Sequence, residues 1–219
     1  MFKIYQTNSS LIQEKYSLSE LLEKMPDAIK ERALRYKFEA DAYQFVVGRL
    51  LLRYGLKEMG FDDLLDKIYI LENGKPYLEK LSFNISHSGN IVVCVLADLG
   101  QVGIDIEQHK QIKLSDFEAF FTPKEWIDID TAENPLQKFF MYWTRKESII
   151  KALGVNLSYL HQIEIDLAKN YFIEKEQYWY LYDLDFGEGY TGALCSDIDS
   201  ELQKIELSAE VLYKAKPHL

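Results

Sequence analysis

Apolar and polar residues in the first half of the chain follow patterns that predict strands around two helices. A strand is expected at residues 2–7, and Pro26-Asp27 begins a helical stretch. Residues 39–58 predict a second and more apolar helix, because their apolar side chains recur at the spacing of a helical face. Further strands are expected on either side of an Asn73-Gly74 turn within residues 68–78, and at residues 82–86, 91–98 and 101–108.

The second half also begins with a strand, continues through helices and returns to strands. Thr122, Pro123 and Glu125 occupy the N-cap, N1 and N3 positions of a helix, which is the pattern of a capping box. Asn134-Pro135 begins the longest helix, which Gly154 can end. Strand-like segments follow at residues 161–167, 178–186, 190–197 and 205–213.

The two halves therefore share a loose order of strand, helices and antiparallel strands. No linker between them is rich enough in proline, glycine or serine to separate independent domains. We expect an α+β protein with an N-terminal subdomain at residues 1–100 and a C-terminal subdomain at residues 101–219.

Composition narrows the classes of function. The 219 residues are 47% hydrophobic and 27% charged, which is typical of a globular protein, and the net charge of −10 argues against nucleic-acid binding. The N-terminus has no apolar core of a signal peptide, and the longest apolar run, residues 91–97, is too short to span a membrane. Cys94 and Cys195 lie in apolar strand-like surroundings and are interpreted as buried thiols. We expect a cytoplasmic protein that does not bind membranes.

Two carboxylates in the segment GIDIE are the first candidates for chemistry. In a strand Asp105 and Glu107 point to one face, roughly 7 Å apart along the chain, while Ile104 and Ile106 point to the other. Oxygen ligands of this kind suit Mg²⁺. The alternative is an ordinary half-buried strand with a solvated acidic face, and the motif alone leaves both open.

A second candidate lies in the segment WTRKESIIKALG. Glu147 and Lys151 are four residues apart on the predicted helix and share a face, with Trp143 one turn earlier. The alternative is a surface ion pair, which is common and weakly stabilising.

Basic residues provide further candidates. Lys75 follows the Asn73-Gly74 turn and is either a binding residue or a solvated loop lysine. A basic cluster, which is either an anion site or a solvated helix face, comprises Lys30, Arg32, Arg35, Lys37, Arg49 and Arg53.

The polar stretch SFNISHSGN raises the question of a nucleophile. Ser86 and His87 are sequence neighbours, so their side chains diverge in an extended chain, and no triad partner is evident. The chain also has no P-loop and no GxGxxG pattern. The sequence therefore argues against a serine hydrolase. It also argues against a nucleotide-binding site of the P-loop or GxGxxG type.

The order of these motifs is more specific than any one of them. From about Lys75 to Gly154, the segments GKPYL, FNISHSG, VGIDIE, FFTPKEW and WTRKESIIKALG resemble the 4′-phosphopantetheinyl transferases of the surfactin-synthetase type. The resemblance implies two similar α/β subdomains related by pseudo-twofold symmetry, with coenzyme A in the cleft between them.

The resemblance also implies an activity. The family transfers 4′-phosphopantetheine from coenzyme A to a serine of an acyl, peptidyl or polyketide carrier protein, with Mg²⁺, and releases adenosine 3′,5′-bisphosphate. The chain would then be a monomeric holo-[acyl-carrier-protein] synthase. Two alternatives stay open: a Mg²⁺-dependent nucleotide phosphohydrolase, and a non-catalytic module that binds coenzyme A or a carrier.

Roles for single residues follow from the same resemblance. Glu147 and Lys151 match the catalytic positions, with Lys151 near the reacting phosphate, and either Glu147 or a metal-bound water takes the serine proton. The role of Glu125 is left open, because the capping box already explains it, and some relatives have an arginine near the position of Gln44. The matched metal ligands are Asp105, Glu107 and Glu147, and the matched coenzyme A residues are Arg32, Arg35, Arg49, Lys75, Pro76, Ser86, His87 and Lys151. A turn between strands is expected to expose Ser86 and His87.

Overall fold

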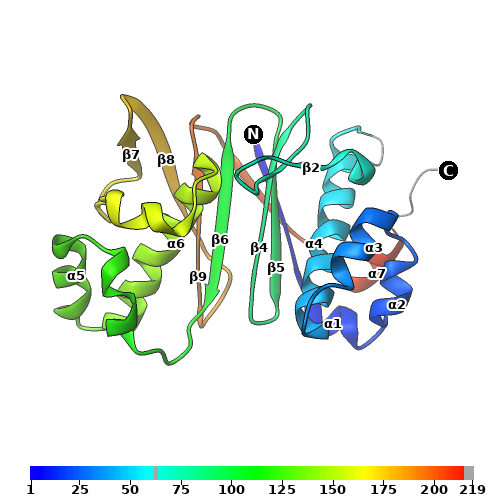
Figure 1. The fold of residues 1–219 in the computed structure, drawn as a ribbon, viewed down its shortest axis with the longest axis horizontal. Coiled ribbons are helices and arrows are strands. Elements are labelled where there is room, and N and C mark those ends of the chain that lie inside the picture. The colour runs from blue at the N-terminus through cyan, green and yellow to red at the C-terminus, as the bar shows by residue number, and fades with distance from the viewer. Residues whose placement is uncertain (62–63, 215–219) are drawn as a thin grey trace. The chain divides into compact units, whose positions relative to one another are not determined.

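Each of two units of the chain contains a four-stranded sheet (Figure 1). The computed structural model describes residues 1–61 and 64–214. Unit 1 contains Met1–Ile70, Pro76–Asp98 and Glu201–Leu219, and unit 2 contains Leu71–Lys75 and Leu99–Ser200. The expectation of two similar α/β subdomains is confirmed, since each unit also packs one long helix against its sheet.

Unit 1 is built around the strand order β10-β1-β5-β4. Helix α4 packs against β5, β4 and β1, and its apolar face closes the core of this unit (Figure 1). A small ribbon of β2 (Tyr69–Ile70) and β3 (Pro76–Tyr77) lies outside the sheet. The other elements are β1 (Phe2–Asn8), β4 (Ser82–Ser88), β5 (Ile91–Ala97), β10 (Leu202–Glu206), α1 (Ser9–Gln13), α2 (Leu18–Leu22), α3 (Asp27–Ala33), α4 (Glu39–Glu58), α7 (Ala209–Lys214) and the 3₁₀ turn η1 (Leu65–Lys67).

Unit 2 has the strand order β6-β9-β8-β7, with every pair antiparallel. Helix α6 packs on β6 and β9, and the apolar residues of α6 and α5 contribute to the second core. The elements are β6 (Val102–Gln108), β7 (Tyr171–Glu174), β8 (Gln177–Leu184), β9 (Tyr190–Ser196), α5 (Pro123–Asp130), α6 (Pro135–Leu153) and the 3₁₀ turns η2 (Leu114–Phe120) and η3 (Leu157–Gln162).

The C-terminal limit of the second subdomain differs from the sequence-based expectation. The chain passes from unit 1 to unit 2 between Asp98 and Leu99, close to the expected boundary at residue 100. However, β10 pairs with β1 in parallel, so the segment from Glu201 returns to unit 1. The range 101–219 was wrong in this respect, because a parallel pairing of distant segments leaves no local signal in the sequence.

Two of the expected strands have another conformation. Residues 161–167 form the end of η3 and an irregular segment, in which Ile163 and Ile165 are buried without joining a sheet. Within residues 205–213, β10 ends at Glu206 and α7 begins at Ala209. Alternation of apolar residues therefore reported burial correctly, but the backbone of Ile165 donates its hydrogen bond to the side chain of Glu125 and not to a strand.

The helix boundaries agree with the sequence signals. Thr122 accepts a hydrogen bond from the Glu125 backbone and Glu125 reciprocates, so the capping box of α5 is confirmed. Gly154 ends α6 in the left-handed region, with φ of 70°. None of the helices in residues 1–61 and 64–214 is both long enough and apolar enough to span a bilayer.

Candidate functional site

Strand β6 presents its two carboxylates on one face. Val102, Ile104 and Ile106 alternate with them and are fully buried on the other face. Asp105 is itself 2% exposed, while Glu107 is half-buried. A solvated acidic face is therefore wrong for Asp105, and a buried carboxylate needs compensating charge or hydrogen bonds.

Helix α6 covers the same face of β6 that carries the carboxylates. A Cβ atom built on Gly103 would lie 2.2 Å from the carbonyl oxygen of Ser148 and 2.3 Å from the backbone nitrogen of Ala152. The helix and strand backbones thus meet at Gly103, where no larger residue fits. Asp105 is the next residue on this face, so side chains of the last turns of α6 can reach it.

Lys151 of α6 forms an ion pair with Asp105 of β6, next to the close contact of the two backbones at Gly103. Its Nζ lies 2.6 Å from Oδ1 of Asp105, and the lysine side chain is 27% exposed. The alternative of a solvent-exposed Glu147–Lys151 surface pair is therefore wrong for Lys151, whose partner lies 46 residues away in sequence.

Glu147 lies one turn before Lys151 and is half-buried. Burial raises its pKa to about 7, the ammonium of Lys151 opposes this shift, and the charges of Asp105 and Glu107 add to it. Burial also lowers the pKa of Lys151, but the neighbouring carboxylates together raise it above its usual range. The three carboxylates and the lysine thus form one electrostatically coupled group.

The donor set of this group fits a hard divalent cation. Asp105 and Glu107 each make ionisation of Glu147 less favourable, and a cation bound among the three would remove that cost. Within residues 1–61 and 64–214, no three Asp, Glu, His or Cys side chains are already arranged as a metal site.

Lys75 caps the C-terminus of α6. Its Nζ donates a hydrogen bond to the carbonyl oxygen of Ala152 at 2.7 Å, and it also lies 3.4 Å from Oε1 of Gln101. Burial lowers its pKa to about 8. The interpretation as a solvated loop lysine was wrong, because the Asn73-Gly74 turn brings Lys75 onto the helix end. Pro76, the next residue, begins β3.

The buried ion pair between Glu125 and Lys146 was not anticipated from the sequence. Oε2 of Glu125 lies 2.7 Å from Nζ of Lys146, and Oε1 accepts from the backbone of Ile165 at 2.9 Å. Lys146 also donates to the carbonyl oxygens of Phe120 and Leu160. The sequence held a signal, since position 146 shares a helical face with the apolar residues Phe139, Tyr142, Ile149 and Ile150.

The structure brings two of the three predicted arginines together in unit 1. The guanidinium groups of Arg32 and Arg49 lie 5.2 Å and 4.2 Å from the ring centre of Phe45. Arg49 is 7% exposed, and burial followed by repulsion from Arg32 lowers its pKa to about 10. Arg35 is instead exposed and pairs with Glu31 at 3.9 Å.

No carboxylate balances the charge beside Phe45 in the part of the chain that the structure describes. Neither Arg32 nor Arg49 has an Asp or Glu oxygen within 4.0 Å there. Two like charges of which one is buried favour an anion as their partner.

Ser86 and His87 lie within strand β4, not in the turn. Gly89 and Asn90 make the turn between β4 and β5. Ser86 is buried and His87 is exposed, on opposite faces of the strand, as expected for neighbours in an extended chain. The expectation that a turn exposes both residues was therefore wrong. Gln44 of α4 donates a hydrogen bond to the carbonyl oxygen of Gly89, so it anchors this hairpin.

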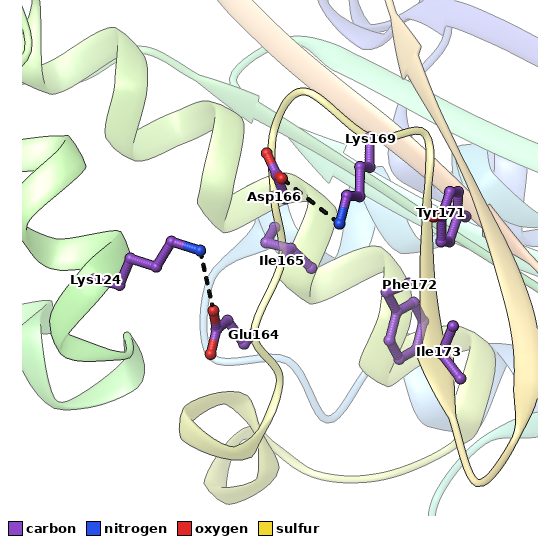
Figure 2. A pocket seen from close by; sticks show the side chains of 8 residues that line it. All are labelled: Lys124, Glu164, Ile165, Asp166, Lys169, Tyr171, Phe172 and Ile173. Atoms are coloured by element: carbon purple, nitrogen blue, oxygen red, sulfur yellow. Dashed lines mark hydrogen bonds and ion pairs between the residues drawn. The ribbon is translucent and has the colours of Figure 1, made fainter.

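A cavity of about 260 Å³ lies elsewhere in unit 2, between the N-terminus of α5, residues 164–169 and β7 (Figure 2). Figure 2 shows two ion pairs at its border, Lys124 with Glu164 and Lys169 with Asp166. None of its lining residues is one of the predicted site residues. The cavity is therefore separate from the coupled carboxylate and lysine group.

Comparisons with known proteins connect the two units to one family. A family described as "4'-phosphopantetheinyl transferase superfamily" matches residues 101–195, and one described as "4'-phosphopantetheinyl transferase, N-terminal" matches residues 13–98. These two matches cover most of unit 2 and much of unit 1.

Individual relatives extend over most of the chain. A 4'-phosphopantetheinyl transferase of Bacillus subtilis is 37% identical over 59% of this chain and 60% of its own length. The 4'-phosphopantetheinyl transferase gsp of Aneurinibacillus migulanus is 33% identical over 74% of this chain and 72% of its own length. The 4'-phosphopantetheinyl transferase Sfp of Bacillus subtilis (strain 168) is 32% identical over 76% of this chain and 80% of its own length. The chain thus spans three fifths of the first of these relatives and more of the other two.

Proposed function

The chain belongs to the 4′-phosphopantetheinyl transferase superfamily, and on this premise we propose that it transfers 4′-phosphopantetheine from coenzyme A to a serine of a carrier protein. The observation that carries the proposal is the coupled group of Asp105, Glu107, Glu147 and Lys151. This group combines carboxylate oxygens that could bind a metal ion with a lysine ammonium that could bind a phosphate. In the finer form of the proposal the enzyme is a Mg²⁺-dependent holo-[acyl-carrier-protein] synthase.

The transfer replaces one phosphorus–oxygen bond by another. The serine oxygen forms a bond to the phosphorus that carries pantetheine, the bond from this phosphorus to the pyrophosphate bridging oxygen breaks, and adenosine 3′,5′-bisphosphate leaves. Phosphoryl transfer of this kind requires positioning and charge neutralisation more than covalent help from the protein. A preassembled cluster of charged side chains is suited to that task.

Three carboxylates would hold the metal. Asp105 and Glu107 come from one strand face and Glu147 from the helix that packs on it. A bound Mg²⁺ supplies neutralisation of the charge on the pyrophosphate oxygens.

Glu147 would accept the serine proton, and Lys151 would neutralise charge on the phosphate. A cation held by the three carboxylates would offset the rise in the pKa of Glu147 and leave it ionised near neutral pH, which is the form that can accept the serine proton. Asp105 and Glu147 raise the pKa of Lys151 above its usual range in this structure, so Lys151 is protonated here and its ammonium would neutralise the departing phosphate. The two residues thus have different tasks on one helix face.

Residues of unit 1 would bind the nucleotide part of coenzyme A. Support comes from Arg32 and Arg49, which concentrate positive charge beside the ring of Phe45. Ser86 and His87 would add hydrogen-bond donors, Pro76 would add a further contact, and Lys75 of unit 2 would add another. Arg35 has weaker support, because its guanidinium is exposed and beside Glu31. The position of coenzyme A, a monomeric state and a cytoplasmic location stay predictions.

Mass spectrometry of carrier proteins tests the proposal. Apo forms of acyl, peptidyl and polyketide carriers are incubated with the enzyme, Mg²⁺ and coenzyme A. We expect at least one carrier to gain one phosphopantetheine group while adenosine 3′,5′-bisphosphate accumulates. Release of a nucleotide without carrier modification would instead indicate a phosphohydrolase, and binding without turnover a non-catalytic module.

A further inference from the structure

The partner of Lys151 is the residue that a metal would also need. Its ammonium lies 2.6 Å from Oδ1 of Asp105, which is one of the proposed metal ligands. A divalent cation bound to Asp105 would lie within a few ångströms of this ammonium. Because both groups are positively charged and Asp105 is buried, the two cations repel each other strongly there. Lys151 and a metal therefore compete for one carboxylate.

Burial decides which member of the ion pair can move. The side chain of Asp105 is 3% exposed and that of Lys151 is 27% exposed. Asp105 also belongs to a strand paired along its length with β9, so its position is held by the sheet. Lys151 has a flexible four-carbon stem and lies in the last turn of α6. Lys151 can therefore leave without repacking the core, whereas Asp105 cannot.

Asp105 needs a counter-ion both before and after a metal ion binds. An isolated buried carboxylate is costly, and Glu107 and Glu147 add negative charge nearby. Lys151 supplies the compensating charge in the structure described here. Once another cation takes over that task, the ammonium of Lys151 is released for a new anionic partner.

We propose that Lys151 is the resident counter-ion of Asp105 and gives up this carboxylate for a substrate phosphate when a divalent cation binds. The inference rests on the proposed function, because it assumes a metal at Asp105 and a phosphate near Lys151. It makes Lys151 a competitor of the metal in the free enzyme and a partner of the phosphate in the loaded enzyme. Metal binding and the placement of Lys151 are thereby one coupled event.

Metal affinity in the absence of coenzyme A tests the competition. Binding of Mn²⁺ is followed by electron paramagnetic resonance of the free ion, and binding of Mg²⁺ by calorimetry, on the whole chain. The variant Lys151→Met should bind both ions at least about tenfold more tightly than the wild type, because the competing hydrogen-bonded charge is gone. Lys138→Met is the matched control, since it removes a lysine of α6 that pairs with Asp128.

The outcomes separate the inference from the function on which it rests. Equal or weaker metal binding by Lys151→Met overturns the inference, and so does equal tightening in Lys138→Met, which would reflect net charge alone. If neither wild type nor Lys151→Met binds Mn²⁺ or Mg²⁺, the proposed metal site falls and the inference falls with it. Carrier modification by the wild type is measured in parallel, so that a failed competition is distinguished from a missing activity.

A measurement on the wild-type protein avoids any folding defect of the variant. Lysines are acylated for short times with an amine-reactive reagent, with and without Mg²⁺, and peptides are quantified by mass spectrometry. Lys151 should react with the reagent several-fold faster when Mg²⁺ is present, because its ammonium is then no longer held by Asp105. Lys138 serves as the internal reference and should not change. An unchanged or slower reaction of Lys151 would overturn the inference.

Discussion

The carboxylate of Glu125 lies 2.7 Å from the ammonium of Lys146, and neither side chain is more than 1% exposed. Glu125 also accepts hydrogen bonds from the backbone of Thr122 and Ile165, and Lys146 donates to the carbonyl oxygens of Phe120 and Leu160. The pair joins the start of α5 to α6 immediately before Glu147 in the chain. The structure thus gives Glu125 a role beyond the capping box, as the partner of a fully buried lysine.

Breaking this ion pair should destabilise the fold strongly. Removal of one partner leaves an uncompensated buried charge, so Lys146→Ala should lower the free energy of unfolding by about 3–5 kcal/mol. Lys138→Ala, which breaks a more exposed pair with Asp128, should cost no more than about 1 kcal/mol. Urea denaturation of both variants measures the difference. Similar losses for the two would contradict the buried pair.

Glu147 should make stability depend on pH in the absence of divalent cations. Its pKa is raised from 4.5 to about 7 in the folded state, so its contribution to stability is present below pH 4.5 and is lost as the pH rises through 7. Glu147→Gln cannot ionise and should therefore gain stability relative to the wild type, by about 1–3 kcal/mol at pH 8. Urea denaturation in a chelator at several pH values checks this. A difference that stays constant from pH 5 to 8 would argue against a raised pKa.

Arg49 should contribute more to coenzyme A binding than Arg35. Arg49 is buried beside Arg32 and Phe45, whereas Arg35 is exposed beside Glu31. Loss of a hydrogen bond to a charged phosphate costs about 1.5–3 kcal/mol, so Arg49→Met should weaken binding by roughly tenfold or more. Arg35→Met is the control and should change affinity less than threefold. Calorimetry with coenzyme A measures both, and equal effects would exclude an anion site beside Phe45.

The three carboxylates should share one metal requirement. Asp105→Asn, Glu107→Gln and Glu147→Gln keep the shapes of the side chains but each removes an anionic oxygen from a hard-cation site. We expect carrier modification at limiting Mg²⁺ to fall at least tenfold in each variant, with partial recovery in Asp105→Asn and Glu107→Gln at high Mg²⁺. Glu133→Gln, an exposed acidic residue outside the group, is the control. Wild-type rates in all three variants at limiting Mg²⁺ would rule out the shared site.

Local geometry is what the sequence by itself determined. The capping box at Thr122, the end of α6 at Gly154 and the shared face of Asp105 and Glu107 all followed from residue type and spacing. These features depend on the backbone within a few residues, and the periods of helix and strand are properties of the backbone. The order of the motifs also indicated the protein family, because several short patterns in one order are far more specific than any one of them.

Tertiary packing alone decided the partners of the charged side chains. The spacing of Glu147 and Lys151 suggested that these two interact, but only the close contact of α6 and β6 at Gly103 brings Lys151 to Asp105 as well. The same contacts bury Lys146. A side chain takes the partner that burial and charge make most favourable, and both depend on segments that lie far apart in sequence. The return of β10 to β1 was hidden for the same reason, since the spacing of residues carries no record of which distant strand lies alongside.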